Sequence, residues 1–539
     1  ERVRRTADLE GSSAVQISRP DDFFAAAHDE FADRAEVWSG ELYLEMHRGT
    51  YTSQARTKQG NRRSEHLLRE AEVWCTTAAV QTGARYPYED LDRLWKRVLL
   101  HQFHDILPGS SIAWVHREAE QAYVEIAEEL EGLITTAQTA LAGTGKVPVV
   151  FNAAGHERHG VPALGARRAK DAGKVKTSHA AKGWTISNGL VTAKINNSGV
   201  LTSVVDHAAD DDEADREVLA GPGNLLQLHI DTPNQWDAWD VDKFYRHTVS
   251  DVTAVDQITE IDNGIKITRT VGDSTLEQTV TLEPGAEQVD FSIDVDWHDR
   301  ETMLKAGFLL DVHAERSAAE TQFGHVFRPT HTNTSWDAAK FEICAQRYLH
   351  LAEEGYGVAL VNDSTYGHDV TRVEAANGLA TEARLSLLRA PLFPDPDADQ
   401  GRHQMRYSLV VGADLGAAVR QGMAINLPER IVTGSGDSVA PLVSVDNDDI
   451  VVSAVKQADD ESGDIVVRLY QATGARSRGR LDLGFSAKEV RATDLLERPI
   501  GGRGANASSL TEGPSVALRH GGVDLELRPF QMITLRFER

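Results

Sequence analysis

Residues 91–110, LDRLWKRVLLHQFHDILPGS, predict an amphipathic helix that runs into a turn. The apolar residues of this stretch recur at the spacing of one helical face, and they are Leu91, Leu94, Trp95, Val98 and Leu99. Pro108 and Gly109 follow, and both residue types interrupt helices and favour turns. We therefore expect a helix over residues 89–104 and a turn directly after it.

Helical periodicity continues on both sides of this stretch. It predicts one helix over residues 62–82 and another over residues 111–141. Short turns join both of them to the helix expected over residues 89–104. Helices connected in this way pack as antiparallel neighbours, so we expect a three-helix bundle over residues 61–142. Ser110 or Ser111 is a candidate N-cap of the third helix, because a serine hydroxyl accepts hydrogen bonds from first-turn amides.

The N-terminal residues 1–60 combine a helical signal at 21–32 with a strand-like pattern at 36–44. This combination is typical of the last part of an α/β layer. Glu45, His47 and Arg48 then follow the apparent strand, at the edge where α/β sheets present functional residues. These three residues are candidate substrate contacts. An ion pair between Arg48 and Glu45 that braces a loop is an equally good interpretation.

After residue 143 the hydrophobic period changes from 3.6 to 2. Val289, Phe291, Ile293 and Val295 alternate with polar residues, as in a strand with one buried face. Many such strands predict an antiparallel sandwich. The expected fold class is α+β multidomain: the tail of an α/β domain over 1–60, the helical bundle over 61–142, a large β-sandwich over 143–427 and a C-terminal β domain over 428–539.

Composition is that of a soluble globular protein of several domains, with 539 residues, 41% hydrophobic and 26% charged. No apolar run approaches the 18 residues that a membrane span needs. The net charge of −26, from 82 acidic and 56 basic residues, disfavours nucleic acid or an anionic membrane as a partner. Two cysteines are too few for a disulfide framework, which favours a cytoplasmic location.

His101, His104 and Asp105 are the candidate functional groups at the end of the predicted helix. If the helix continues to residue 105, they are i, i+3 and i+4 neighbours on one turn and could converge on a metal ion. A catalytic zinc usually takes three protein ligands, and this turn offers two at most. On spacing alone, the favoured interpretation is a helix-terminal histidine bonded to a backbone carbonyl, where it complements the helix dipole.

Several segments, in the same order and spacing, resemble the bacterial and cytosolic branch of the glycoside hydrolase family 38 α-mannosidases. They are GELYLEMHRGTYTSQ at 40–54, HQFHDILPGS at 101–110, WDAWD at 236–240, RPTH at 328–331, NTSWD at 333–337, YGVAL at 356–360 and LSLLR at 385–389. The resemblance covers almost the whole chain. One departure is Thr332, where we expect arginine, so a guanidinium contact at that position is in doubt.

The resemblance implies a zinc-dependent retaining mannosidase, with residues 1–60 as the tail of its α/β catalytic domain. The family histidine that matches His104 is a zinc ligand, and the aspartate that matches Asp105 lies at the bound mannose, so we expect these roles here. His101 has no such role in the family, and we interpret it as structural.

The remaining catalytic parts of the family match nothing in residues 1–53. These parts are a His-x-Asp ligand pair, an aspartate that is both ligand and nucleophile, and an acid/base aspartate. A retaining glycosidase needs two carboxyl groups across the scissile bond, so we expect them outside this chain. His229-Ile230-Asp231 copies the His-x-Asp spacing, but its neighbours resemble the β-region of the family rather than the metal site.

The sequence therefore predicts the helical and β domains of a retaining α-mannosidase that releases terminal α-mannose from mannose-containing oligosaccharides. We expect the 539 residues alone to be inactive. Related enzymes often form homo-oligomers, but the sequence does not show the oligomeric state. The alternative is a non-catalytic carbohydrate-binding or assembly module.

Overall fold

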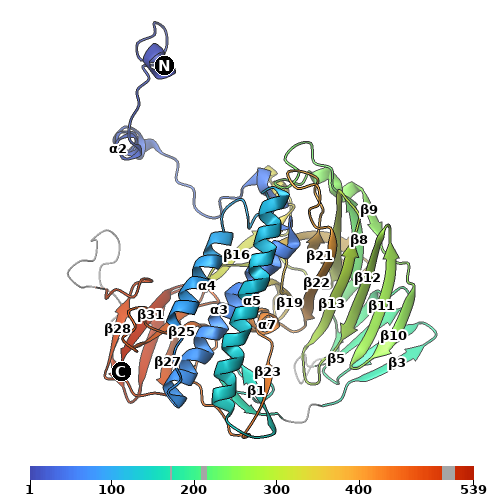
Figure 1. The fold of residues 1–539 in the computed structure, drawn as a ribbon. Coiled ribbons are helices and arrows are strands. Elements are labelled where there is room, and N and C mark those ends of the chain that lie inside the picture. Colours follow the sequence, from blue (N-terminus) through green and yellow to red (C-terminus); the bar gives the residue numbers. More distant parts are fainter. Residues whose placement is uncertain (170–172, 208–214, 501–515) are drawn as a thin grey trace. The chain divides into compact units, whose positions relative to one another are not determined.

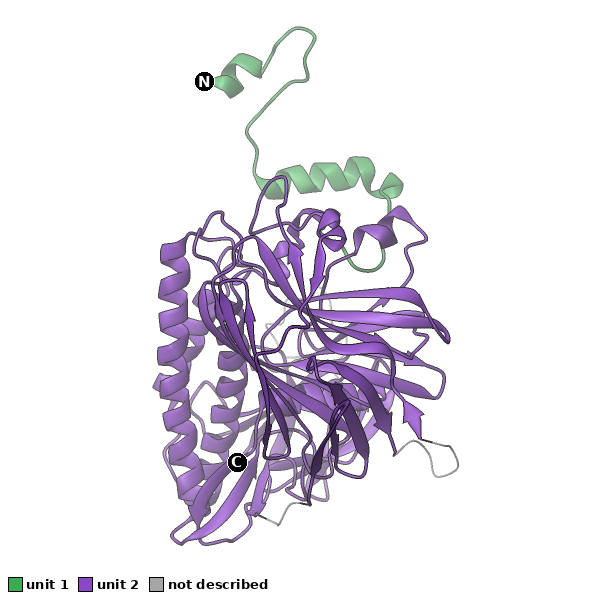
Figure 2. Cartoon of the chain, turned by 90° about the vertical axis from the view of Figure 1, so that its right-hand side faces the viewer, with its two compact units in different colours: residues 1–43 green, residues 44–539 purple. Residues whose placement is uncertain are grey.

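A computed structural model describes residues 1–169, 173–207, 215–500 and 516–539. The chain forms two compact units, residues 1–43 and residues 44–539, coloured separately in Figure 2. The first unit contains α1 (Arg2–Thr6), α2 (Pro20–Phe31) and the 3₁₀ turn η1 (Ala32–Arg34). No residue of these helices is buried.

The helix expected over residues 21–32 is confirmed by α2, but the strand expected over 36–44 is wrong. Residues 36–44 form no strand. Val37 and Leu42 are 91% and 82% exposed, so the apolar positions of the pattern have no surface to bury against. An isolated segment without a paired neighbour gains too little to form a stable strand.

The second unit begins with the 3₁₀ turns η2 (Glu45–His47) and η3 (Gly49–Tyr51), followed by three long helices. These are α3 (Ala55–Thr82), α4 (Tyr88–His101) and α5 (Ala113–Ala142), which lie side by side in Figure 1 and contact one another pairwise. The predicted bundle is present, with its first helix starting seven residues earlier than the pattern indicated. Of the helices described, none combines the length and the apolar character needed to cross a membrane.

The second helix of the bundle ends at His101 and not at residue 104, which corrects the sequence prediction. The amide of Gln102 still bonds to the carbonyl of Val98, but its ψ of 7° leaves the helix. The predicted N-cap of α5 is also wrong, because Ile112 occupies that position without a side-chain cap. The Ser110 and Ser111 hydroxyls donate instead to Asp105, so this residue organises the turn.

A large sandwich of two antiparallel sheets follows the bundle (Figure 1). Over the described ranges, the first sheet has eleven strands, in the order β17 (Ile343–Cys344), β20 (Gly367–Ala375), β21 (Gly378–Leu388), β14 (Thr302–Leu310), β8 (Leu219–Ile230), β6 (Leu201–Asp206), β5 (Val191–Asn196), β4 (Gly183–Ser187) and β3 (Lys176–Ala180), with β7 (Arg216–Glu217) beside β6 and β9 (Val249–Asp251) beside β8. The second sheet has nine described strands, in the order β10 (Gln257–Ile261), β11 (Gly264–Val271), β12 (Ser274–Thr281), β13 (Gln288–Trp297), β22 (Gly401–Val410), β19 (Tyr356–Asn362), β18 (Tyr348–Glu353), β15 (Arg316–Thr321) and β16 (Gly324–Pro329).

The inner faces of these two sheets form one core. The alternation predicted around Phe291 is confirmed, since Val289, Phe291, Ile293 and Val295 are all buried in β13. Phe291 lies opposite Tyr407 of β22 in register, and its ring centroid is 5.7 Å from that of Phe308 on the other sheet. Three short elements connect the strands: η4 (Lys243–His247), α6 (Ser335–Ala339) and α7 (Leu415–Asn426).

The remaining strands form three smaller sheets, again within the part of the chain that the structure describes. They are β2 (Gly165–Arg168), β1 (Val147–Asn152) and β23 (Arg430–Gly434); then β24 (Val443–Val445), β27 (Ser477–Leu483), β30 (Gly522–Leu527) and β29 (Leu518–Arg519); and β25 (Ile450–Gln457), β26 (Ile465–Gln471), β31 (Met532–Glu538) and β28 (Glu489–Thr493). The fold class expected from the sequence, helices followed by antiparallel β domains, is confirmed.

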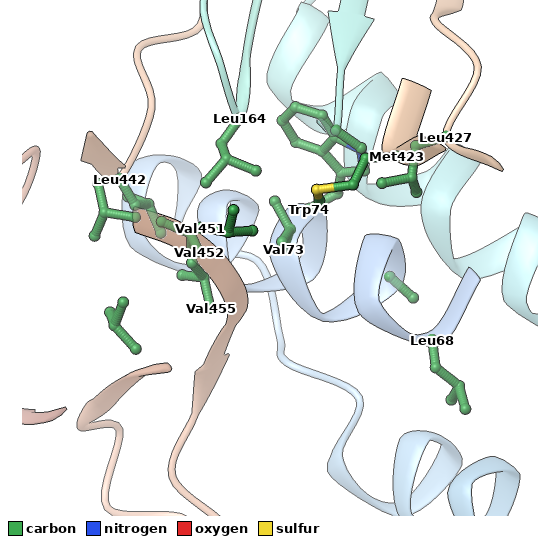
Figure 3. Packing of buried hydrophobic residues seen from close by; sticks show 14 of the residues in the cluster. Leu68, Val73, Trp74, Leu164, Met423, Leu427, Leu442, Val451, Val452 and Val455 are labelled. Atoms are coloured by element: carbon green, nitrogen blue, oxygen red, sulfur yellow. The ribbon is translucent and has the colours of Figure 1, made fainter. Parts of the chain in front are cut away.

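A second core joins the bundle to the C-terminal strands. Figure 3 shows Val73 and Trp74 of α3 near Val451 and Val452 of β25, and all four side chains belong to one buried cluster. The Trp74 ring also meets Phe151 of β1 edge to face, with centroids 5.1 Å apart. The bundle therefore packs through α3 against β-structure.

Candidate functional site

The turn between α4 and α5 presents His104 and Asp105 on the surface. Their side chains are 77% and 46% exposed, and His104 Nε2 lies 3.6 Å from Asp105 Oδ2. The turn is closed by the amides of Ile106 and Leu107, which donate to the carbonyl of Phe103 at 2.9 and 3.1 Å. The two groups are thus neighbours on a tight turn and not on a continuing helix.

His101 takes no part in this exposed pair. It ends α4, its ring centroid lies 5.5 Å from that of Tyr123 in α5, and burial lowers the pKa of its imidazole. Among the described residues His101 Nδ1 has no hydrogen-bond partner. These contacts fit the structural interpretation of His101, since a metal ligand needs an accessible ring nitrogen.

The turn rests on the start of α3. A Cβ added to Gly109, whose φ is +85°, would lie 2.3 Å from the carbonyl oxygen of Ser53. Only glycine allows this close approach. Lys58 of α3 is buried and donates to the carbonyl oxygens of Ser53 and Leu107. The backbone carrying His104 and Asp105 is therefore fixed to residues 53–58.

Arg48 joins three segments that are far apart in the sequence. Its Nε and Nη2 donate to the Ala339 carbonyl at 3.1 and 3.0 Å, its Nη1 lies 3.3 Å from Asp240 Oδ1, and its guanidinium lies 4.4 Å from the centre of the Phe341 ring. The suggested ion pair with Glu45 is not formed, because Arg48 donates to the backbone carbonyl of that residue instead. Its side chain is nearly buried, so it braces the loops around it.

The other two candidates before Arg48 lie on η2. Glu45 is exposed, whereas the His47 side chain is partly buried. His47 Nδ1 has no hydrogen-bond partner among the residues described, and its carbonyl accepts a bond from the Thr50 hydroxyl at 2.5 Å. Local turn geometry thus accounts for their positions.

The sequence interpretation gave Arg389 no role beyond its place in the LSLLR motif, although this residue organises the same region. It is fully buried, its Nε donates to Asp231 Oδ2 at 2.7 Å, and its Nη2 donates to the carbonyl of Asp240 at 2.8 Å. Its Nη1 reaches Ser53 Oγ and the Ala238 carbonyl, at 3.2 and 3.3 Å. The available signal was a single arginine in the apolar run LSLLRAPLF at 385–393.

The His229-Ile230-Asp231 sequence at the end of β8 is a structural feature. His229 and Asp231 are buried on one face of the strand, and burial lowers the pKa of His229 to about 3. Asp231 is the ion-pair partner of Arg389. Over the described ranges, no group of three or more His, Cys, Asp or Glu side chains is arranged to hold a metal ion.

Three family models match this chain, and together they span the bundle and both β regions. Residues 45–141 match the alpha mannosidase middle domain, and residues 186–397 match the glycosyl hydrolases family 38 C-terminal domain. Residues 449–535 match the glycosyl hydrolases family 38 C-terminal beta sandwich domain. The chain belongs to glycoside hydrolase family 38. The recognition from sequence motifs is confirmed, and the turn with His104 lies in the middle domain of this family.

The family 38 chain is similar to alpha-mannosidases of several organisms. It is 32% identical to Alpha-mannosidase 2C1 of Homo sapiens over 585 residues, which cover 99% of this chain and 54% of that protein. It is 30% identical to Alpha-mannosidase of Saccharomyces cerevisiae over 553 residues, with coverages of 93% and 48%. The chain thus spans about half the length of the curated relatives that it matches.

The family 38 fold is also shared with a solved structure. The crystal structure of an alpha-mannosidase from Enterococcus faecalis V583 matches with a TM-score of 0.76 and 17% sequence identity. The match covers 97% of this chain and 72% of that one. At this identity the likeness concerns the fold.

Proposed function

We propose that this chain contributes the middle and C-terminal domains of a zinc-dependent retaining α-mannosidase, which releases terminal α-mannose from mannose-containing oligosaccharides. The observation that carries the proposal is the exposed pair of His104 and Asp105 on a fixed turn, within the residues that match the alpha mannosidase middle domain. The curated relatives named alpha-mannosidases support the substrate class.

In this proposal His104 is one zinc ligand. Its imidazole is exposed and lies on a turn whose backbone is tied down, as a ligand should be. Catalytic zinc takes about three protein ligands, and the described residues contain no group of three that could hold it. We propose that the parent polypeptide supplies the remaining ligands. A bound zinc would polarise and orient sugar hydroxyls.

Asp105 would accept a hydrogen bond from a sugar hydroxyl. Its Oδ1 takes the Ser110 hydroxyl at 3.1 Å, and its backbone carbonyl takes the Ser111 hydroxyl at 2.8 Å. These bonds set the orientation of the carboxylate and direct Oδ2 toward His104. A charged acceptor held in this way forms stronger hydrogen bonds than a neutral one, so Asp105 would select for a hydroxyl beside the metal.

Glu45, His47 and Arg48 would act at the border of the sugar site. We assign Arg48 a bracing role, because Ala339, Asp240 and Phe341 already surround its guanidinium. Glu45 is the exposed member and would contact a sugar hydroxyl directly. A retaining mechanism also needs a nucleophile and an acid/base carboxyl, which we place, with the missing zinc ligands, outside these residues. We further propose a cytoplasmic homo-oligomer.

The alternative is a non-catalytic carbohydrate-binding or assembly module. The lack of a three-ligand metal group in the described part of the chain favours it for the 539 residues taken alone. The two functions are separated by measuring zinc content and aryl α-mannoside hydrolysis of this chain, in parallel with the longer parent polypeptide. Zinc and hydrolysis only in the longer form would support the mannosidase proposal, and hydrolysis by the chain alone would overturn the placement of the catalytic groups.

The assignment of His104 is tested by substitution in the parent polypeptide. We expect His104→Ala to remove zinc and most of the hydrolytic activity. His179→Ala is the matched control, since His179 is exposed on β3 and packs against Trp184. Full zinc occupancy in His104→Ala would refute the role of this residue.

A further inference from the structure

Lys58 is a lysine in a place where lysines are rarely found. Its side chain is 2% exposed, near the N-terminal end of α3. Burial lowers the pKa of its ammonium group to about 7, and the negative charge of Asp399 only partly opposes this effect. Burying an amine costs free energy that an aliphatic side chain of similar length would not. A lysine in such a place therefore calls for a specific role.

The contacts of Lys58 suggest what that role is. Its Nζ donates to the carbonyl oxygen of Ser53, which precedes α3, and to that of Leu107 at 3.0 Å, in the turn between α4 and α5. Ser53 and Leu107 each present a backbone oxygen to the same nitrogen. The amine thus bridges two segments that no backbone hydrogen bond joins in the described structure.

The segment that Lys58 holds is the one that carries the candidate ligands. Leu107 closes the turn by donating its amide to Phe103, so His104 and Asp105 lie inside the loop that this bond closes. His104 is mostly exposed and has few contacts of its own. The orientation of its imidazole therefore depends on the backbone of the turn, and the Leu107 carbonyl is a point where that backbone is fastened.

We propose that Lys58 is a positioning residue, which holds the turn of residues 103–109 so that His104 and Asp105 are presented in one fixed orientation. This inference rests on the proposed function for what the turn presents, a zinc ligand and a sugar contact. Lys58 itself touches neither metal nor sugar. It acts through the carbonyl of Leu107, while Gly109 allows the turn to approach Ser53 closely enough for the bridge to form.

The first test uses this chain without any metal. Hydrogen exchange at the amides of Ile106, Leu107 and Gly109, all donors within the turn, reports how firmly the turn is held. We expect Lys58→Met to increase exchange at these amides about tenfold, as for the loss of one buried hydrogen bond, without changing exchange in the middle of α3 and α5. Lys96→Met, on the exposed face of α4, is the matched control.

Unchanged exchange in Lys58→Met would overturn the inference. If this variant does not fold, Gly109→Ala provides the second perturbation, because its Cβ would push the turn away from Ser53. It should accelerate exchange at Ile106 and Leu107 in the same way. Normal exchange in that variant would show that the contact with residues 53–58 does not hold the turn.

The second test uses the parent polypeptide. There Lys58→Met should weaken zinc binding and lower kcat more than it raises KM, although no ligand has been removed. Lys58→Arg should restore part of the zinc affinity and of kcat, because a guanidinium can still donate to the Ser53 and Leu107 carbonyls. Wild-type zinc affinity in Lys58→Met would refute the positioning role. A wild-type parent that binds no zinc would instead refute the proposed function, while the exchange experiment would still judge whether Lys58 holds the turn.

Discussion

Replacing Arg389 by methionine is the substitution with the most clearly defined cost. The guanidinium is fully buried and donates to the Asp231 carboxylate, the Ser53 hydroxyl and the carbonyls of Ala238 and Asp240. Methionine fills much of the same volume but leaves the Asp231 carboxylate buried without its cation. Removing one partner of a buried pair costs about 3–5 kcal/mol, and each lost hydrogen bond to a carbonyl adds roughly 0.5–1.5 kcal/mol.

We therefore expect Arg389→Met to lower the free energy of unfolding by about 4–8 kcal/mol, measured from urea-induced unfolding. Arg402→Met is the matched control, because Arg402 pairs with Asp294 in the large sandwich but its side chain is 72% exposed. Exposed pairs contribute about 0–1 kcal/mol. The Asp231→Asn variant should also be destabilised, because it leaves the buried guanidinium of Arg389 without its anionic partner.

The double variant with Asp231→Asn and Arg389→Met tests the reasoning most directly. If the cost of Arg389→Met comes from an uncompensated carboxylate, neutralising Asp231 in the same molecule recovers part of it, and the double variant loses less than the sum of the single ones. Strict additivity, or a loss in Arg389→Met no larger than in Arg402→Met, would refute this explanation of the buried pair.

Three further predictions concern the same region and are checked by urea unfolding. Burial lowers the pKa of Lys58 from its ordinary 10.5 to about 7, so the unfolded state binds more protons than the folded state between these pH values. The stability of wild type relative to Lys58→Met should therefore rise with pH above 7, by roughly 1.4 kcal/mol per pH unit. A stability difference that does not change with pH would contradict the burial of the amine. Gly49→Ala places a Cβ 1.8 Å from Arg389 Nη1 and should cost about 1–3 kcal/mol, whereas Gly132→Ala in α5, with no atom within 4 Å, should be neutral or stabilising. Asp399→Asn should lower the free energy of unfolding by about 1–3 kcal/mol. Both carboxylate oxygens of Asp399 accept backbone amides, at 2.7 and 3.2 Å, and an asparagine offers only one acceptor oxygen. Wild-type stability in this variant would show that these bonds contribute little.

Local patterns in the sequence predicted the elements better than their ends or their partners. The alternation at Phe291 identified a strand with one buried face, because alternation is a property of the strand itself. Its pairing with Tyr407 depends on a segment more than one hundred residues away and leaves no local trace. The end of α4 at His101 was misjudged because helical periodicity does not show where a helix ends, and the bonds from the Ser110 and Ser111 hydroxyls to Asp105 exist only in the folded turn.

In the candidate site, too, residues were predicted only where the sequence itself marks them. His104 and Asp105 were selected by resemblance to a family, since their spacing alone favoured an ordinary helix-terminal histidine. Lys58 was not selected, and Arg389 was quoted only as part of the LSLLR motif without a role. What distinguishes both residues is a buried charge, and burial is decided by strands and helices distant in the sequence. The segments around Asp240 had been recognised as family motifs, but the ion pair with Arg48 that gives them a role exists only in the folded chain.

The bonds of Arg48 also bear on the order in which the molecule is assembled during synthesis. Lys58 reaches a partner 49 residues ahead, so the turn can be fastened as soon as the helical bundle has emerged. The bonds of Arg48 to Asp240 and Ala339 can form only later in synthesis, because these partners lie 192 and 291 residues further along the chain. Contacts over such separations form late. In the nascent protein the His104 turn can therefore be fastened before Arg48 forms its bonds to Asp240 and Ala339.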